Sequence, residues 1–271
     1  MKQLITYFLL AYLISWTIWL PLYGTVFGLN NLPILLYHHG LGAFGPMIAA
    51  FITTWYFKKQ IGMSMLLKRC YNYKSLTYLI VALLSPFLLV VVAAIINYLV
   101  DDTPMHLNPL ISSKEFPQFN IISFFLYNLV FFGFGEEVGW RGFALPIFQS
   151  KFNALVSSIL LTLFWAIWHW PLFFYRPGFT SMDFSSIIGW FFSLLTGSIL
   201  LTWLYNSSKA SILICAIFHS TIDIAFTADF ENKNIINYTG FLITLWGILT
   251  IIYFKPKNLS KSERSKSDLI A

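Results

Sequence analysis

Five side chains that can take part in acid–base chemistry lie in or beside long apolar stretches of the sequence: Glu136, Glu137, His169, His219 and Asp223. A charge at the centre of a bilayer costs roughly 3 kcal/mol or more, so such residues point to function by default. A carboxylate can take a proton from water, and a histidine N–H can face a developing negative charge. These five residues therefore suit a site that hydrolyses its substrate. The alternative is that they form structural ion pairs between helices.

The spacing of the first cluster separates its two glutamates. Residues four apart share a helix face, so Glu137 and Arg141 are predicted to form a structural ion pair. Glu136 is turned by about 100° from its neighbour and has no evident local partner, which leaves it as the candidate general base. Four nearby glycines, which allow close approach of backbones or substrate, are Gly133, Gly135, Gly139 and Gly142.

The other two clusters repeat the same helical spacing. Trp165 precedes His169 by four residues, so its ring can shelter the imidazole, and Pro171 is expected to end or kink the helix. His219 and Asp223 are also four apart and are predicted to project from one face.

The composition places these residues in a membrane protein. Of 271 residues, 58% are hydrophobic and 10% are charged, against ~25% charged in soluble domains, and the mean hydropathy is +0.71. This excludes a soluble enzyme, a disordered chain and a nucleic-acid-binding module, and it implies membrane lipids as partners. The sequence predicts an all-α polytopic bundle of about eight spans, at 4–22, 40–57, 76–100, 119–136, 153–175, 185–205, 210–228 and 236–254.

The basic residues predict the orientation. With the N-terminus in the cytoplasm, 14 of the 17 Lys and Arg residues fall on the cytoplasmic side, so both termini are predicted to be cytoplasmic. Residues 1–254 are interpreted as one transmembrane domain, and 255–271 as a basic, disordered cytoplasmic tail. The predicted location is a bacterial plasma membrane. His38, His39 and His106 fall in predicted loops and are given no role.

Straight helices with these bounds would hold the polar residues too far apart. At ~1.5 Å per residue, Glu136 lies far from the outer end of its span, whereas His169 lies close to the outer end of its own span. We therefore expect the fourth span to continue past Glu136, with Arg141 buried in a polar cavity. The position of Glu136 predicts that this cavity opens toward the cytoplasm.

Taken together, the three clusters resemble the CPBP intramembrane proteases. This family includes the Rce1-like type II CAAX prenyl endopeptidases, bacteriocin-processing proteins and lysostaphin-resistance-like proteins. Glu136-Glu137-x-x-x-Arg141 resembles the family's EExxxR motif. Trp165-x-x-x-His169 is similar to FxxxH with Trp in place of Phe, and His219-x-x-x-Asp223 fits HxxxN or HxxxD. The resemblance covers about 119–228.

The resemblance implies an intramembrane endopeptidase that acts on membrane-embedded or lipidated peptides. It implies that Glu136 activates water with help from His169, that His219 and Asp223 stabilise the oxyanion, and that Glu137, Arg141 and Trp165 support the site. We favour a mechanism without a metal, because the sequence has no HExxH motif. A Zn²⁺ ion held by Glu136, His169 and His219 is the alternative cofactor. Alternative functions are a proton-coupled transporter and a non-catalytic immunity or scaffold protein.

Overall fold

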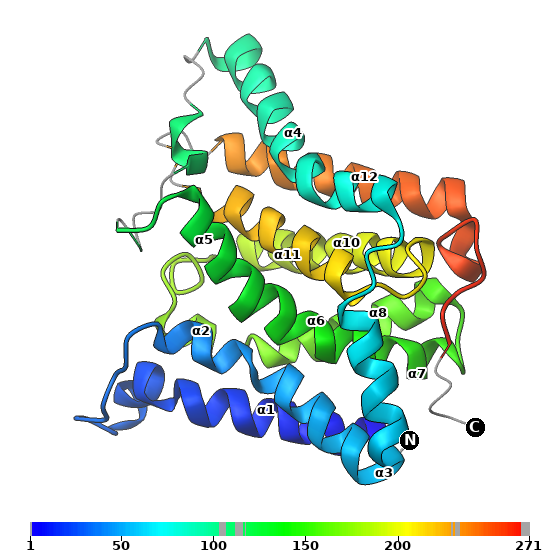
Figure 1. Cartoon of the computed structure of the whole chain (residues 1–271). Coiled ribbons are helices and arrows are strands. Elements are labelled where there is room, and N and C mark those ends of the chain that lie inside the picture. The colour runs from blue at the N-terminus through cyan, green and yellow to red at the C-terminus, as the bar shows by residue number, and fades with distance from the viewer. Residues whose placement is uncertain are drawn as a thin grey trace.

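The computed structural model is built from helices. It describes residues 2–102, 107–111, 116, 118–228, 230 and 234–266, and within these residues every regular element is helical (Figure 1). The prediction of an all-α polytopic bundle is therefore confirmed. His106 lies outside the described residues, as do Lys114 and Lys233, two of the 17 basic residues counted for the orientation.

Seven helical segments are long and apolar enough to cross a membrane within the described part of the chain. The predicted span at 210–228 corresponds to a shorter helix, α11 (Ile212–Thr227), whose 16 residues extend ~24 Å against a bilayer core of ~30 Å. Besides the composite fourth span, the seven segments are built on α1 (Lys2–Tyr23), α3 (Gly45–Cys70), α4 (Leu76–Asp101), α8 (Ala154–Trp168), α10 (Phe184–Ser207) and α12 (Asn234–Asn258); the segment that contains α8 continues to Tyr175. Short helices are η1 (Gly24–Phe27), α2 (His38–Ala43), η2 (Asn108–Ile111) and α9 (Leu172–Tyr175).

The fourth span continues well beyond Glu136, as expected. It passes without a break through α5 (Ile121–Asn128), the π-helix η3 (Leu129–Phe134), α6 (Gly135–Gly139), the π-helix η4 (Trp140–Ala144) and α7 (Leu145–Gln149). The predicted end at residue 136 is wrong by 13 residues, because the charges in this stretch are paired inside the bundle.

The fifth span runs over Ala154–Tyr175, in agreement with the predicted bounds 153–175. It consists of α8 and α9, which Pro171 separates, as expected from the sequence. The predicted end of the second span at residue 57 is wrong, because the helix extends to Cys70, and non-helical backbone angles at Lys59 redirect its last ~3 turns.

Side-chain caps begin four helices of the bundle. Asn120 Oδ1 accepts a hydrogen bond from the Ser123 backbone N–H at the start of α5, and Asn153, Asp183 and Ser211 do the same for α8, α10 and α11. These caps satisfy N–H groups that have no partner within the helix. The Ser186 backbone N–H that donates to Asp183 holds the pKa of this exposed carboxyl below its usual value.

Aromatic packing joins α1 to the fourth span and α8. The ring of Phe8 stacks on Phe164 with centroids 4.0 Å apart, and Tyr7 meets Trp140 edge to face at 5.7 Å. α1 also packs along α3, while α4 and α12 cover the opposite side of α11 (Figure 1). The fourth span is thereby enclosed on several sides.

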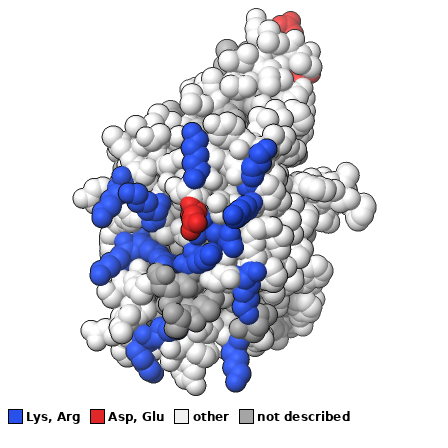
Figure 2. Space-filling model, turned by 90° about the vertical axis from the view of Figure 1, so that its right-hand side faces the viewer, with Lys and Arg blue, Asp and Glu red and all other residues white. Residues whose placement is uncertain are grey.

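One end of the bundle carries a concentration of positive charge. The start of α1 and the end of α12 lie at this end, on the right of Figure 1, and Figure 2 shows Lys and Arg side chains gathered over it. We call this end the basic face. Its exposed lysines include Lys68, Lys151, Lys209, Lys257 and Lys266. Such an excess is typical of the cytoplasmic side, which agrees with the predicted orientation.

The predicted disordered tail is wrong for its described part. α12 continues to Asn258, and the following segment packs on the bundle, with Leu259 fully buried. The Arg264 Nε donates to the Gln149 carbonyl oxygen at 2.9 Å, and the Ser265 backbone N–H donates to Asn206. The polar composition of the tail does not reveal that it binds Gln149 at the end of α7 and Asn206 near the end of α10. Residues 267–271 lie outside the described residues.

Candidate active site

The site is built around α6, which lies between two π-helical segments. π-Helical turns are rare and often occur at functional sites. Close contacts with α3 and α11 depend on glycine here, because a Cβ at Gly133 would lie 2.6 Å from the Ala216 carbonyl oxygen. A Cβ at Gly139 would lie 2.6 Å from the Pro46 carbonyl oxygen. The glycines thus serve helix packing, which brings the two glutamates of α6 against neighbouring helices.

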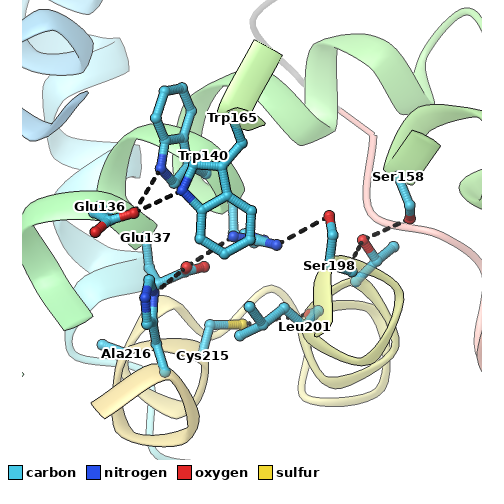
Figure 3. Close-up of polar contacts among 12 residues, drawn as sticks. Glu136, Glu137, Trp140, Ser158, Trp165, Ser198, Leu201, Cys215 and Ala216 are labelled. Atoms are coloured by element: carbon cyan, nitrogen blue, oxygen red, sulfur yellow. Dashed lines mark hydrogen bonds and ion pairs between the residues drawn. The ribbon is translucent and has the colours of Figure 1, made fainter. Parts of the chain in front are cut away.

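Glu137 is the centre of a buried charged cluster. Its Oε1 accepts a hydrogen bond from Arg141 Nη1 at 2.8 Å and lies 2.7 Å from His219 Nδ1 (Figure 3). Glu137 and Arg141 are both 0% exposed. Arg141 also donates to Ser198 Oγ at 3.1 Å, and its guanidinium lies 4.7 Å from the centroid of Trp165. The predicted Glu137–Arg141 pair is therefore present, with His219 as an additional partner.

Glu136 points to the other side, toward α8. Its Oε2 accepts two indole N–H hydrogen bonds, from Trp165 at 2.8 Å and from Trp140 at 3.2 Å (Figure 3). The residue is 4% exposed, and its Oε1 makes no hydrogen bond within the described part of the chain. One oxygen of the carboxylate is thus fixed, and the other is left for a further ligand.

His169 lies at the C-terminus of α8, one turn after Trp165. Its Nδ1 is 2.8 Å from the Trp165 carbonyl oxygen, which can only accept, so Nδ1 carries the proton. In the neutral ring, Nε2 is then an acceptor. The Trp165 ring lies 5.7 Å from the imidazole of His169 and 5.5 Å from that of His219, so it contacts both histidines.

His219 and Asp223 share one face of α11, as predicted. Asp223 Oδ2 lies 3.6 Å from His219 Nε2, which is longer than a hydrogen bond, and 30% of the Asp223 side chain is exposed. Because Glu137 occupies Nδ1, the opposite nitrogen of His219 faces Asp223. The imidazole therefore lies between two carboxyl groups.

Comparisons with known proteins point to the same part of the chain. Residues 118–225 match the model of the Rce1-like type II CAAX prenyl endopeptidases. The match covers 108 of the 271 residues, so this part of the chain is similar to that family. Over 93 residues, the chain is 36% identical to the protein named CAAX prenyl protease 2 of Methanococcus maripaludis, a match that covers 33% of this chain and 34% of that protein. The match thus spans about a third of the relative's length, and it confirms the resemblance inferred from the three motifs.

Three contacts of the candidate site were missed by the sequence argument. Trp140 is four residues after Glu136, so the same spacing rule that paired Glu137 with Arg141 could have found it. The contact of Glu137 with His219 and the contact of Arg141 with Ser198 join separate helices, and no local pattern indicates them.

The alternative zinc site was predicted on Glu136, His169 and His219. Among the described residues, no group of three or more His, Cys, Asp or Glu side chains is arranged to hold a metal ion. Glu136 Oε2, His219 Nδ1 and His169 Nδ1 already have protein partners, which leaves Glu136 Oε1 and the two histidine Nε2 atoms as the atoms that could bind a metal. Zn²⁺ held by these three residues stays the alternative to the metal-free prediction.

The predicted loop histidines are also part of the folded structure. His38 and His39 lie in α2, where His38 Nε2 is 2.6 Å from the Ile18 carbonyl oxygen. His39 Nδ1 is 2.7 Å from the hydroxyl of Tyr175. The prediction that His38 and His39 lie in loops is therefore wrong, and their side chains connect α2 to its neighbours.

Proposed function

We propose that this protein is an intramembrane endopeptidase that hydrolyses peptide bonds of membrane-embedded or lipidated peptides. The observation that carries this proposal is the pairing of a buried carboxylate with a nearby histidine cluster. Glu136 is held through one oxygen by two indole N–H groups, while Trp165 joins it to His169 and His219. The Rce1-like match of residues 118–225 supports the same chemistry.

Glu136 acts as the general base. Its Oε1 takes a proton from a water molecule, and the resulting hydroxide attacks the carbonyl carbon of the scissile peptide bond. When the C–N bond breaks, the proton passes from Glu136 to the leaving amine. His169 assists, because its Nε2 can accept a hydrogen bond from the same water while Nδ1 is fixed by the Trp165 carbonyl.

His219 stabilises the oxyanion of the tetrahedral intermediate. Glu137 holds its Nδ1–H, so a ring that carries both protons donates from Nε2 toward the site. Asp223 donates to the oxyanion when it is protonated and orients His219 when it is not. Glu137 and Arg141 keep this arrangement in place inside the bundle.

We propose that the reaction needs no metal and that the substrate contacts the protein within the lipid. The metal-free proposal is supported by the sequence, which has no HExxH motif, and by the described residues, among which no group of three or more His, Cys, Asp or Glu side chains is arranged to hold a metal ion. The protein is a multi-pass membrane protein, and we propose a bacterial plasma membrane as its location, although the relative from Methanococcus maripaludis is archaeal.

Proteolysis in reconstituted liposomes tests this function. The assay supplies membrane-anchored peptides with and without a prenyl group to the wild type, to Glu136→Gln and to Glu263→Gln. Glu263 is exposed and serves as the matched control for the same chemical change. We expect the wild type and Glu263→Gln to cleave a peptide and Glu136→Gln to leave it intact. Cleavage by Glu136→Gln at the wild-type rate would reject the proposed base, and loss of wild-type cleavage with a chelator, restored by Zn²⁺, would reject the metal-free mechanism.

A further inference from the structure

The last turn of α8, which leads directly into His169, receives hydrogen bonds from side chains of α1. Trp168 is the last residue of α8, so its carbonyl oxygen has no partner within the helix, and the Trp16 indole N–H donates to it at 3.0 Å. One turn earlier, the Tyr12 hydroxyl donates to the Phe164 carbonyl oxygen at 2.8 Å. The two donors are four residues apart, as are the two acceptors, so one face of α1 holds the end of α8.

The side chain of Trp168 is fixed by a second set of buried hydrogen bonds. Its ring meets the imidazole of His169 edge to face, with centroids 5.0 Å apart, and is 1% exposed. The Trp168 indole N–H donates to Ser15 Oγ at 2.7 Å, and the Ser15 hydroxyl donates to the Gly42 carbonyl oxygen at 2.8 Å. Ser15 is 0% exposed and uses its hydroxyl both as acceptor and as donor. The ring that lies against His169 is therefore connected through α1 to α2.

The chain that follows His169 is also held from outside. Pro171 interrupts the helix after His169, so the backbone there lacks the support of a continuous α8. In α9, the hydroxyl of Tyr175 lies 2.7 Å from His39 Nδ1, and the Trp19 indole N–H donates to the His39 carbonyl oxygen at 2.7 Å. Contacts with α1 and α2 thus hold the chain on both sides of His169.

We infer that Ser15 and Trp16 of α1 are positioning residues for the reaction. They fix Trp168 and thereby keep the His169 imidazole with Nδ1–H on the Trp165 carbonyl oxygen and Nε2 free to accept a hydrogen bond from water. This inference rests on the proposed function. The two residues lie outside residues 118–225, which match the family model, so none of the three motifs contains them.

Nuclear magnetic resonance of ¹⁵N-labelled histidine tests the positioning without any need for activity. The chain has five histidines, and the signals of His169 are identified by their loss in His169→Gln. Ser15→Ala and Trp16→Phe are compared in detergent at alkaline pH with the wild type and with Ser157→Ala. Ser157 is a buried serine of α8 whose hydroxyl donates to the Asn153 carbonyl oxygen at the other end of the helix, so it is the matched control. Trp16 is only partly buried and Trp16→Phe keeps an aromatic ring, so this variant serves if Ser15→Ala does not fold.

We expect His169 of the wild type and of Ser157→Ala to carry its proton on Nδ1. In Ser15→Ala and Trp16→Phe, the signals of both ring nitrogens should shift toward a mixture of the two tautomers. His169 signals that stay at their wild-type positions in the folded variants would overturn the inference.

The liposome assay then connects the position of His169 to cleavage. Ser15→Ala and Trp16→Phe are expected to lower kcat about 10-fold with KM unchanged, because a displaced imidazole affects the reacting water and leaves peptide binding intact. An unchanged kcat, or an equal decrease in Ser157→Ala, would overturn the inference. If the wild type cleaves no peptide, the proposed function fails, and the histidine signals still decide whether α1 fixes the imidazole.

Discussion

Replacing Arg141 by Met is expected to destabilise the fold strongly. Arg141 is 0% exposed, and the substitution removes the 2.8 Å contact with Glu137 and the 3.1 Å hydrogen bond to Ser198. It leaves Glu137 as a buried charge, which costs about 3–5 kcal/mol when one partner of a buried pair is lost. At roughly 2–4 °C per kcal/mol for a chain of this size, the expected decrease in Tm is about 6–20 °C in detergent.

The double variant Glu137→Gln/Arg141→Met separates the charge from the packing. It removes both charges, keeps an amide oxygen that can accept from His219, and is expected to recover about 2 kcal/mol of the loss. Tm is measured by thermal unfolding for both single variants, the double variant and the exposed control Lys257→Met, which should lie within about 0.5 kcal/mol of the wild type. A Tm for Arg141→Met equal to that of the control, or strictly additive losses, would refute the buried pair.

Three further variants, with Gly189→Ala as a control, test the positioning of Glu136 and the packing of its helix. Trp165→Phe keeps an aromatic ring but removes the N–H that donates to Glu136 at 2.8 Å, so kcat/KM should fall roughly 10–100-fold. Trp140→Phe removes the longer hydrogen bond of 3.2 Å, so its kcat/KM should fall less. Equal kcat/KM values for both variants and the wild type would contradict the role of the two indoles in positioning Glu136. Gly139→Ala places a Cβ 2.6 Å from the Pro46 carbonyl oxygen and should lower the free energy of unfolding by about 1–3 kcal/mol. A Cβ at Gly189 meets no atom within 4 Å, so Gly189→Ala is the control. Equal Tm values for the two variants in thermal unfolding would reject the close contact at Gly139.

The local part of the site could be predicted from the sequence. Residues four apart on a helix share a face whatever the rest of the fold does, so the Glu137–Arg141 pair and the shared face of His219 and Asp223 followed from spacing. The continuation of the fourth span followed from a length argument, because the polar groups could not otherwise meet. Composition alone was enough to predict a helical membrane bundle.

The contacts between helices could not be predicted in this way. Glu136 and Trp165 are 29 residues apart, and Glu137 and His219 are 82 apart, so their meeting depends on how three helices cross. The folding of residues 259–266 onto the bundle depends likewise on Gln149, a buried amide with no sequence pattern to mark it as a partner. Hydropathy alone does not reveal such buried polar contacts.

The two adjacent glutamates illustrate how one helix can give identical side chains different roles. The ~100° turn between neighbours directs Glu137 to α11 and Arg141, whereas Glu136 is directed to α8 and the indole of Trp165. Glu137 is matched by a full positive charge and therefore suits the positioning of His219. Glu136 meets only neutral donors, which fix one oxygen without neutralising its charge, so it keeps the capacity to accept a proton. Exchange of the two environments, with a cation beside Glu136, would remove the physical basis for its role as the base.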